Sequence, residues 1–331
     1  MDFNTEFLDA PKELVRFIET GSRFIIAGHK EPDGDCVGSQ LALRSALIRL
    51  GKEAIVCSVG PFNRTELKDY TDQFTKFSEA ETKDARVIII DCTGKDRTGD
   101  LQELIEKLPC AIIDHHAVVT HPPSTEQTPV YVDSNAPACV LLVYKLIIAL
   151  GLEITKEEAD LLFFGLCTDT GFFRFLNETN AAVFDIAATL VRCGANPKKT
   201  FNIINGSKSL NSRLLIGNIL SRTESHFEGR LVLTYETLEE YKEFGFEHRD
   251  SDSLYQLLLS VDGVEASVII RQECVDNCTV SLRSVDKINV AKIAGAFGGG
   301  GHKNAAGLKM QGDISYVKQK LLNSFLDSFT H

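Results

Sequence analysis

Short apolar runs that alternate with helical patterns constrain the fold of this chain more than any other feature of its sequence. The runs are Phe24–Ala27, Ala54–Cys57, Val87–Ile90 and Ala111–Ile113. Helical spacing of apolar residues fills intervals between them, as in Leu41–Leu50 and Leu101–Leu108. Continuous apolar strands joined by helices are typical of a parallel sheet that is covered on both faces. The sequence therefore predicts an α/β fold that begins with a doubly wound parallel sheet.

The chain is long enough for two domains, because it has 331 residues and a domain takes roughly 150. Three helices are expected between Pro137 and Cys193, and the last third reads as a smaller mixed α/β domain. We place the first domain at 1–192, a linker at 193–212 and the second domain at 213–331. Between Asp185 and Glu224 the chain has basic but no acidic residues. This basic stretch is either a solvated linker or a basic wall that faces a cleft.

The acidic balance of the chain limits its partners. Asp and Glu number 46 against 35 Lys and Arg, so the net charge is −11. That charge opposes general binding of long DNA or RNA, and it suits a protein that collects metal cations. No apolar run reaches the roughly 18 residues of a membrane span. Nine scattered cysteines and an acidic N-terminus without a signal-peptide pattern favour a reducing cytoplasm.

Acidic residues and histidines follow three of the predicted strands. They are His29, Asp33 and Asp35 after the first run, Asp91 after the third, and Asp114, His115 and His116 after the fourth. A further acid, Asp169, ends the apolar stretch Leu161–Leu166. Because ligands of an open parallel sheet bind at the carboxyl ends of its strands, we expect the first three clusters to meet in one crevice.

This set of side chains suits divalent cations. Carboxylate oxygens bind Mg²⁺ and Mn²⁺, and imidazole shifts the preference toward Mn²⁺ and other transition metals. Four aspartates and two histidines exceed the needs of one tetrahedral zinc, and they fit two ions that share a carboxylate. Two ions about 3.5–4 Å apart can clamp both oxygens of an in-line displacement at phosphorus. Each motif alone also fits a turn or a helix cap, and their joint occurrence is what favours a site.

A second group of candidates lies near the C-terminus. The glycines Gly299, Gly300 and Gly301 precede His302, and successive amides in such a run can form an anion-binding nest. Arg283, at the end of a predicted strand, is a candidate phosphate clamp. Arg174 is a weaker candidate that fits a structural role equally well.

Other residues near these motifs have two interpretations. Cys36, Cys92 and Cys167 lie beside the acidic motifs and are interpreted as small buried residues rather than ligands. The aromatic residues of Gly171–Phe175 could stack a nucleobase, although core packing is the better interpretation for two of the three.

The motifs together resemble those of the DHH phosphoesterases. The pattern His-x3-Asp-x-Asp, the strand-terminal Asp, Asp-His-His and Thr-Asp-Thr-Gly are similar to the four motifs of the family. The segment Gly298–Gly307 is similar to the signature of its DHH-associated second domain. The match runs from about residue 23 to residue 308, and at this chain length it is nearest to the stand-alone NrnA-type enzymes.

The resemblance implies roles for the candidate residues. One metal would be held by His29, Asp33 and Asp91, and the other by Asp35, Asp91, His115 and Asp169. Asp91 would bridge the two ions, which we expect to be Mn²⁺, with Mg²⁺ as the alternative. His116 would face the substrate phosphate, and Asp114 would orient it. Arg283 would contact the substrate from the second domain.

The resemblance also implies a function. The chain would be a phosphoester hydrolase that cuts short 5′-phosphorylated oligoribonucleotides to mononucleotides, as an exonuclease does, or converts 3′-phosphoadenosine-5′-phosphate to AMP. The second domain would recognise the terminal nucleotide and close the cleft. The alternatives are a phosphodiesterase of cyclic or linear dinucleotides such as cyclic-di-AMP and pApA, and a non-catalytic nucleotide-binding module. A monomer and a homodimer both remain open.

Overall fold

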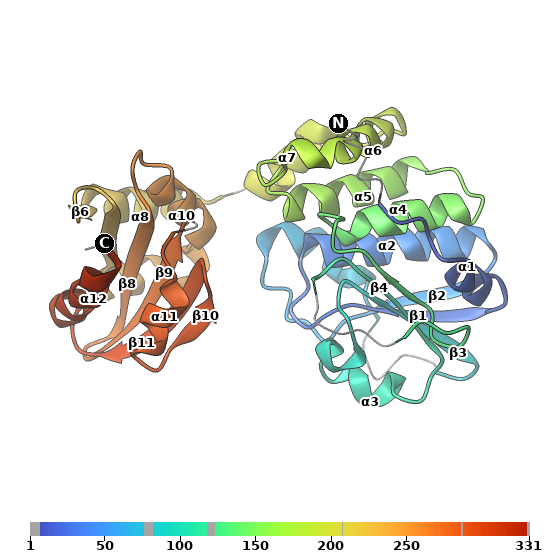
Figure 1. Ribbon diagram of the computed structural model, residues 1–331, viewed down its shortest axis with the longest axis horizontal. Coiled ribbons are helices and arrows are strands. Elements are labelled where there is room, and N and C mark those ends of the chain that lie inside the picture. Colours follow the sequence, from blue (N-terminus) through green and yellow to red (C-terminus); the bar gives the residue numbers. More distant parts are fainter. Residues whose placement is uncertain (1–6, 76–81, 118–122, 207, 286, 330–331) are drawn as a thin grey trace. The chain divides into compact units, whose positions relative to one another are not determined.

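The chain folds into two compact units, Met1–Ser207 and Lys208–His331. The computed structural model describes residues 7–75, 82–117, 123–206, 208–285 and 287–329, and Figure 1 shows the elements of each unit. The boundary lies inside the segment that we assigned to the linker, and the helix α7 (Pro197–Asn205) occupies part of that segment. Within the described ranges, no helix is both long and apolar enough to cross a membrane.

Five parallel strands form the sheet of the N-terminal unit, in the order β2-β1-β3-β4-β5. They are β1 (Arg23–Ala27), β2 (Glu53–Cys57), β3 (Ala85–Ile90), β4 (Cys110–Asp114) and β5 (Val130–Val132). The four predicted runs are the first four strands, so the predicted doubly wound sheet is confirmed. The strand order reverses between β1 and β3, and the crevice at such a switch point is where open α/β sheets bind ligands.

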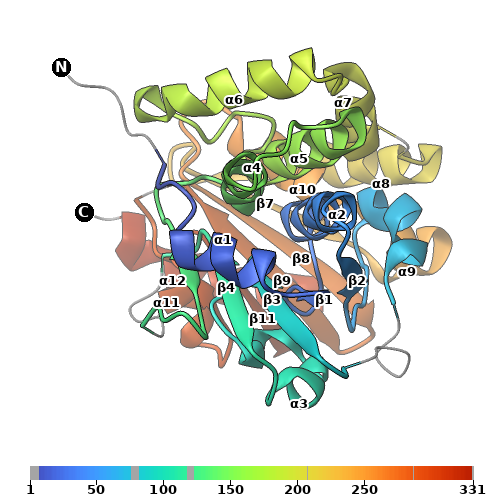
Figure 2. The same ribbon diagram turned by 90° about the vertical axis from the view of Figure 1, so that its right-hand side faces the viewer.

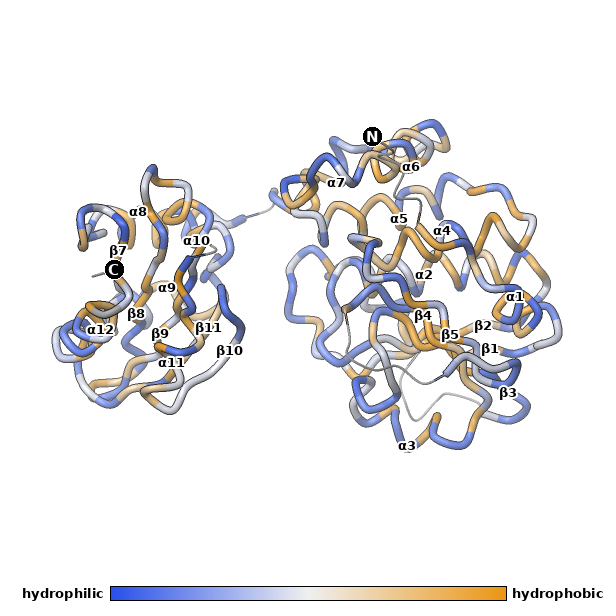
Figure 3. Tube along the Cα trace, viewed as in Figure 1, coloured by the Kyte–Doolittle hydropathy of each residue, from blue (hydrophilic) through white to orange (hydrophobic). Residues whose placement is uncertain are grey.

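Helices cover both faces of this sheet (Figures 1 and 2). They are α1 (Lys12–Glu19), α2 (Gly34–Arg49), α3 (Leu101–Ile105), α4 (Cys139–Ala149), α5 (Lys156–Asp169), α6 (Ala181–Arg192) and α7, with the 3₁₀ segments η1 (Thr65–Gln73), η3 (Lys95–Thr98) and η4 (Glu178–Asn180). Neighbouring residues of β1 enter opposite cores: Phe24 and Ile26 pack with α2 and α5, whereas Ile25 packs with α3. Figure 3 shows hydrophobic residues concentrated along β4, β5, α4 and α5.

Close packing of α2 on α5 determines where the acidic loop after β1 lies. A Cβ atom added to Gly38 of α2 would be 2.6 Å from the carbonyl oxygen of Leu161 on α5. A Cβ atom added to Gly165 would be 3.1 Å from the Cα atom of Asp35. Small residues therefore allow the two helix backbones to approach, and they hold the start of α2 beside the end of α5.

The C-terminal unit contains a six-stranded mixed sheet in the order β10-β11-β9-β8-β7-β6. Its strands are β6 (Glu224–His226), β7 (Leu231–Glu236), β8 (Ala266–Cys274), β9 (Asn277–Ser284), β10 (Gly300–His302) and β11 (Ala305–Gln311). Only β7 and β8 pair in parallel. The predicted mixed α/β domain is confirmed, while β6, β10 and β11 were not predicted; β6 and β10 have only three residues each.

The helices of the C-terminal unit pack on the two faces of its sheet. The helices are α8 (Leu210–Ser221), α9 (Leu238–Phe244), α10 (Ser251–Leu259), α11 (Val290–Gly295) and α12 (Ile314–Phe329), with η5 (Phe246–His248). Residues of α8, α9 and α10 form one apolar core, and residues of α11 and α12 form the other. The helix α8 begins at Leu210, inside the segment that we assigned to the linker, because the Ser209 side chain accepts a hydrogen bond from the Ser212 amide at 3.0 Å.

Replacing Gly38 by alanine should destabilise the N-terminal unit, because a backbone carbonyl cannot yield as a flexible side chain can. Higher helix propensity would add about 1 kcal/mol, whereas an overpacked contact costs about 1–3 kcal/mol. We therefore expect a net loss of up to about 2 kcal/mol in the free energy of unfolding, measured by urea denaturation. Gly217→Ala in α8 is the control, because its added Cβ would meet nothing within 4 Å. A stabilisation of Gly38→Ala equal to that of Gly217→Ala would contradict the close contact.

Candidate metal centre

Three loops bring the predicted acidic and histidine residues to the switch point of the parallel sheet. His29 follows β1, Asp91 follows β3, and His115 follows β4. The fourth motif arrives from a helix, because Asp169 is the last residue of α5. The structure therefore gathers residues from four distant parts of the sequence at the carboxyl ends of the strands.

Asp91 lies at the centre of this group. Its backbone has a positive φ of 61°, and its side chain is 2% exposed. One carboxylate oxygen, Oδ2, is 3.5 Å from His29 Nε2, and the other, Oδ1, is 3.3 Å from His115 Nε2. Oδ1 is buried and makes no hydrogen bond within the described part of the chain. Each oxygen thus faces a different imidazole, which is the arrangement that a bridging carboxylate requires.

The ligand atoms of Asp35, His115 and Asp169 lie within 4.8 Å of one another. His115 Nε2 is 3.3 Å from Asp169 Oδ2 and 3.7 Å from Asp35 Oδ2. Asp35 is fully buried, and its carboxylate accepts hydrogen bonds from the amides of Cys139 and Val140, the latter at 2.9 Å. These are the first amides of α4, so a helix N-terminus stabilises the charge of this carboxylate.

A second group surrounds His29. Its Nε2 atom is 4.0 Å from Asp33 Oδ1, and Asp33 also caps α2 by accepting the Cys36 amide at 3.1 Å. The Sγ atom of Cys36 lies within 4.8 Å of the ligand atoms of His29 and Asp91. Cys36 is buried, as expected, but the structure also places it among the donor atoms. The sequence places Cys36 beside the motif, and only the direction of its side chain from α2 brings its Sγ atom near the ligand atoms.

Backbone carbonyls orient both central imidazoles. His29 Nδ1 lies 2.8 Å from the carbonyl oxygen of Lys30, and His115 Nδ1 lies 3.1 Å from that of Ala136. A carbonyl can only accept, so each Nδ1 carries a proton and donates it. The Nε2 atoms therefore face the carboxylates, which is how metal-binding histidines are usually held.

Asp114 holds the Asp-His-His tripeptide together. Its Oδ1 atom accepts the amides of His115 and His116 at 2.8 and 3.2 Å, and His116 Nδ1 at 2.7 Å. The hydrogen bond to Asp114 raises the pKa of His116, whose side chain is 53% exposed. The predicted orienting pair is thus in contact, and His116 is the more accessible of the two histidines.

The electrostatics of the group favour bound cations. Burial, together with the charges of Asp91 and Asp169, raises the pKa of Asp35 well above its usual range. Burial also raises the pKa of Asp169, to about 7. Burial disfavours the charged form of His115, but the carboxylates of Asp91, Asp35 and Asp169 together outweigh this effect and raise its pKa to about 10. Carboxylates that retain protons when crowded are suited to exchange them for metal ions.

The ligand atoms available at this centre suit a divalent ion that binds both oxygen and nitrogen, such as Mn²⁺. The six predicted ligands supply carboxylate oxygens and imidazole nitrogens, which Mn²⁺ accepts. They are His29, Asp33, Asp35, Asp91, His115 and Asp169. Asp91 Oδ1, which is buried and has no hydrogen bond among the described residues, is an acceptor that a cation would satisfy.

Two predicted substrate residues lie in one row of the second sheet. Ala305 pairs with Arg283 of β9 on one side and with His302 of β10 on the other. Residues directly opposite in antiparallel strands share a face, so both side chains leave the same face. The Arg283 guanidinium lies 4.2 Å from the ring centroid of Tyr255, which gives the arginine a defined position.

The glycine run has a structural role in addition to the anion nest, which stays a prediction. The amides of Gly298 and Gly299 donate to carbonyls of α11, at 3.1 and 2.9 Å, and Gly300 begins the edge strand β10. Gly301 has a φ of 145°, and an added Cβ would lie 2.4 Å from the carbonyl oxygen of Ala305. The glycines therefore end a helix and bring a strand close, which positions His302.

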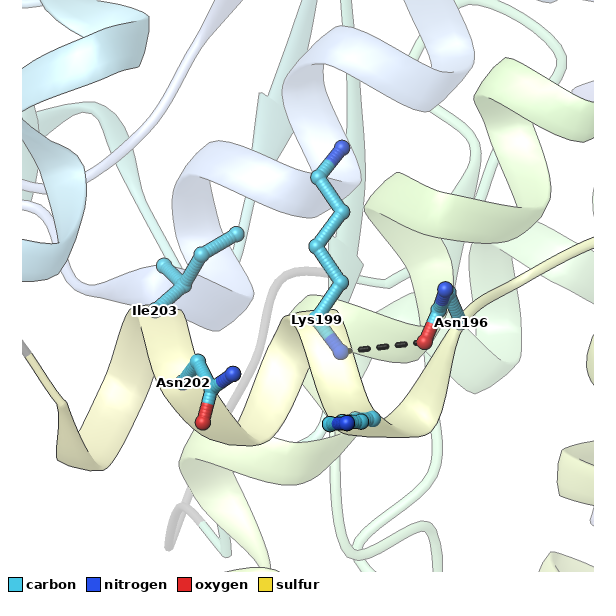
Figure 4. Close-up of a pocket in the computed structure, with 5 residues that line it drawn as sticks. Asn196, Lys199, Asn202 and Ile203 are labelled. Carbon is cyan, nitrogen blue, oxygen red and sulfur yellow. Dashed lines mark hydrogen bonds between the residues drawn. The ribbon is translucent and has the colours of Figure 1, made fainter.

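The basic stretch between Asp185 and Glu224 spans the boundary of the two units, and its cations have different surroundings. Arg213 and Lys208 lie 2.8 and 3.9 Å from the carboxylate of Asp250, so their charges are compensated. The helix α7 instead lines a hollow with Lys198, Lys199, Asn196, Asn202 and Ile203. Figure 4 shows Lys199 extending away from its helix and its amide bonded to the Asn196 side chain.

Two domain families match this chain, one in each of its two units. The DHH family, N-terminal domain, matches residues 23–166, and the DHHA1 domain matches residues 231–330. A Thermus thermophilus protein named bifunctional oligoribonuclease and PAP phosphatase NrnA is 33% identical over 96% of this chain and 93% of its own length. The cyclic-di-AMP phosphodiesterase GdpP of Bacillus subtilis is 25% identical over 96% of this chain and 49% of its own.

A solved structure shares the fold. The crystal structure of an exopolyphosphatase-related protein from Bacteroides fragilis superimposes with a TM-score of 0.80. The two sequences are 24% identical, and the match covers 96% of this chain and 95% of that one. The similarity therefore supports the arrangement of elements described above.

Asp91→Asn should weaken Mn²⁺ binding by at least about 10-fold, because it removes the charge of the central carboxylate. The fold should persist, since asparagine also tolerates a positive φ. Isothermal titration calorimetry with Mn²⁺ measures the effect, and thermal unfolding without metal checks the fold. Asp100→Asn is the control, because Asp100 is exposed and its side chain makes no capping bond. Equal Mn²⁺ affinity and stoichiometry in both variants would contradict the central role of Asp91.

Proposed function

The chain belongs to the DHH family, which confirms the resemblance seen in its motifs, and from this premise we propose that it is a two-metal hydrolase of short nucleotides. Its substrates are 5′-phosphorylated oligoribonucleotides, which it cuts to mononucleotides, and 3′-phosphoadenosine-5′-phosphate, which it converts to AMP. The observation that carries the proposal is Asp91, buried between His29 and His115 with one carboxylate oxygen toward each. The names of the Thermus relative support the choice of substrates.

In the N-terminal unit, six residues bind the metal ions and His116 contacts the phosphate. Divalent ions held by the six ligands would polarise the phosphoryl oxygens and lower the pKa of water. His116, fixed by Asp114 and half exposed, donates a hydrogen bond to a non-bridging phosphate oxygen. The hydrogen bond to Asp114 raises the pKa of His116, which favours the form that donates this hydrogen bond.

The C-terminal unit binds the nucleotide in this proposal. Arg283 and His302 share one face of its sheet, with only the small Ala305 between them. The guanidinium fork suits two oxygens of a phosphate, and Tyr255 limits the entropy that Arg283 loses on binding. A cytoplasmic location is part of the proposal and is supported by nine free cysteines.

A cyclic or linear dinucleotide phosphodiesterase is the second candidate, and the similarity to GdpP favours it. Because the same ligands could serve either activity, substrate comparison has to separate the two. Turnover of pApA together with slow turnover of cyclic-di-AMP would assign the first function. Fast opening of cyclic-di-AMP would assign the second.

Turnover in Mn²⁺ should be fastest on oligonucleotides of about two to five residues, because a chain of net charge −11 gains little by contacting further phosphates. The measurement compares kcat/KM for pApA, 3′-phosphoadenosine-5′-phosphate, cyclic-di-AMP and a long RNA, each with Mn²⁺ and with Mg²⁺. Asp91→Asn is the inactive control. No turnover of any of them in either metal would support a non-catalytic binding module, and equally fast digestion of the long RNA would refute the length limit.

Arg283→Ala should lower kcat/KM for pApA by about 10- to 150-fold, since a charged hydrogen bond contributes about 1.5–3 kcal/mol. Hydrolysis of bis-(p-nitrophenyl) phosphate and Mn²⁺ binding should not change, because Arg283 holds no metal in this proposal. Lys320→Ala is the matched control, since it also removes a cation beside a tyrosine, at 5.6 Å from the Tyr316 ring. Equal loss on the small ester would place Arg283 among the catalytic residues instead.

A further inference from the structure

The turn that follows Asp169 has an unusual backbone. Gly171, Phe172 and Phe173 have φ values of 56°, 58° and 70°, so three successive residues are left-handed. Glycine adopts this conformation readily, whereas side chains with a Cβ atom rarely do. Two consecutive phenylalanines in this region are a strained arrangement, and strain of this kind concentrates where a ligand is held.

Hydrogen bonds hold the strained turn in place. The Phe172 amide donates to the Cys167 carbonyl at 2.7 Å, and the Phe173 amide donates to Thr170 Oγ1 at 3.0 Å. The Phe175 amide then donates to the Thr170 carbonyl at 3.1 Å. The end of α5 therefore fixes the direction of every residue up to Phe175.

The three aromatic rings of this turn have different surroundings. Phe172 and Phe173 pack against Phe163, at centroid distances of 6.5 and 6.1 Å. Phe175 is 70% exposed and belongs to no apolar cluster among the described residues. The two anchored rings explain the core-packing role that was expected for two of the three phenylalanines. The third ring is held at the surface.

Gly171 and Arg174 both lie against the exposed ring of Phe175. An added Cβ at Gly171 would lie 2.6 Å from a ring carbon of Phe175, so only a glycine allows the ring to lie there. The Arg174 guanidinium is 5.5 Å from the ring centroid, and Arg174 Nε donates to the Gly171 carbonyl at 2.9 Å. Gly171 thus contacts the ring directly and orients its cationic neighbour.

The turn that carries this ring begins next to the candidate metal centre. Gly171 is two residues after Asp169, and successive Cα atoms are about 3.8 Å apart, so the two Cα atoms are separated by at most about 7.6 Å. A nucleotide whose phosphate lies at Asp169 would extend its base over a similar length. An aromatic face beside a cation matches the chemistry of a nucleobase joined to a phosphate.

We propose that Phe175, flanked by Arg174, is the stacking platform for a nucleobase adjacent to the phosphate that is cleaved. This inference rests on the proposed nucleotide hydrolysis and adds a residue that positions the substrate. Phe184 and Phe201 are also half exposed, but Phe184 already stacks on Phe173 at 5.5 Å, and Phe201 packs edge-to-face with Phe172 at 5.3 Å. Phe175 is therefore the ring of this aromatic group that is available to a base.

Kinetics on a matched pair of substrates tests the proposal. The pair is pApA and its analogue that lacks both bases. Phe175→Ala should lower kcat/KM for pApA by about 5- to 150-fold, the range of one base–aromatic stack, and should leave the abasic analogue unchanged. Phe175→Trp should retain activity on pApA, because tryptophan also offers a flat ring. Phe246→Ala is the matched control, since Phe246 is 69% exposed and also lies beside an arginine, with the Arg249 guanidinium 5.3 Å from its ring.

A binding measurement provides a second readout. A 2-aminopurine dinucleotide should lose fluorescence by stacking when it binds Asp91→Asn protein, and this quenching should disappear when Phe175→Ala is added. Equal losses on pApA and the abasic analogue, unchanged kinetics on pApA, or quenching that survives Phe175→Ala would each overturn the platform. If wild-type protein hydrolysed neither substrate, the proposed function would fail, while the fluorescence experiment would still decide the role of Phe175.

Discussion

The crowding of carboxylates around Asp91 is the constraint on which the rest of the structure depends. Like charges that are buried together repel each other strongly where water cannot screen them. The structure compensates in part with the imidazoles of His29 and His115 and with the α4 amides that bind Asp35. Cations complete this balance best, because two carboxylate oxygens of the cluster, Asp91 Oδ1 and Asp114 Oδ2, are buried without a hydrogen bond within the described residues.

Close packing of the helices α2 and α5 brings the crowded carboxylates together. Gly38 lets the backbones of α2 and α5 approach until Asp35 and Asp169 lie near one imidazole. The end of α5 then continues into the strained turn that holds Phe175 at the surface. One packing contact between two helices thus connects the acidic cluster with the candidate stacking surface.

Much of this could be predicted from the order of the residues. The apolar runs identified β1 to β4, and the position of Asp91 directly after one of them placed it at a strand end. Other features could not be predicted. The anion nest at Gly298–Gly301 stays a prediction, and the further role of this run, which ends α11 and begins β10, depends on partner carbonyls and β11 being close in space. Cys36 was expected to be buried, and only its orientation in α2 brought it among the donor atoms.

By itself the sequence determined the parallel sheet, the edge at which the polar motifs meet, and the chemical type of their side chains, because periodicity and residue type are local properties. Tertiary structure decided which atoms face one another. Whether His115 Nε2 turns toward Asp169 depends on the Ala136 carbonyl, which accepts the opposite ring nitrogen. Whether Phe175 is buried or exposed depends on Gly171 and on backbone angles that no residue type specifies. Such choices follow from contacts between distant segments, and these exist only once the chain has folded.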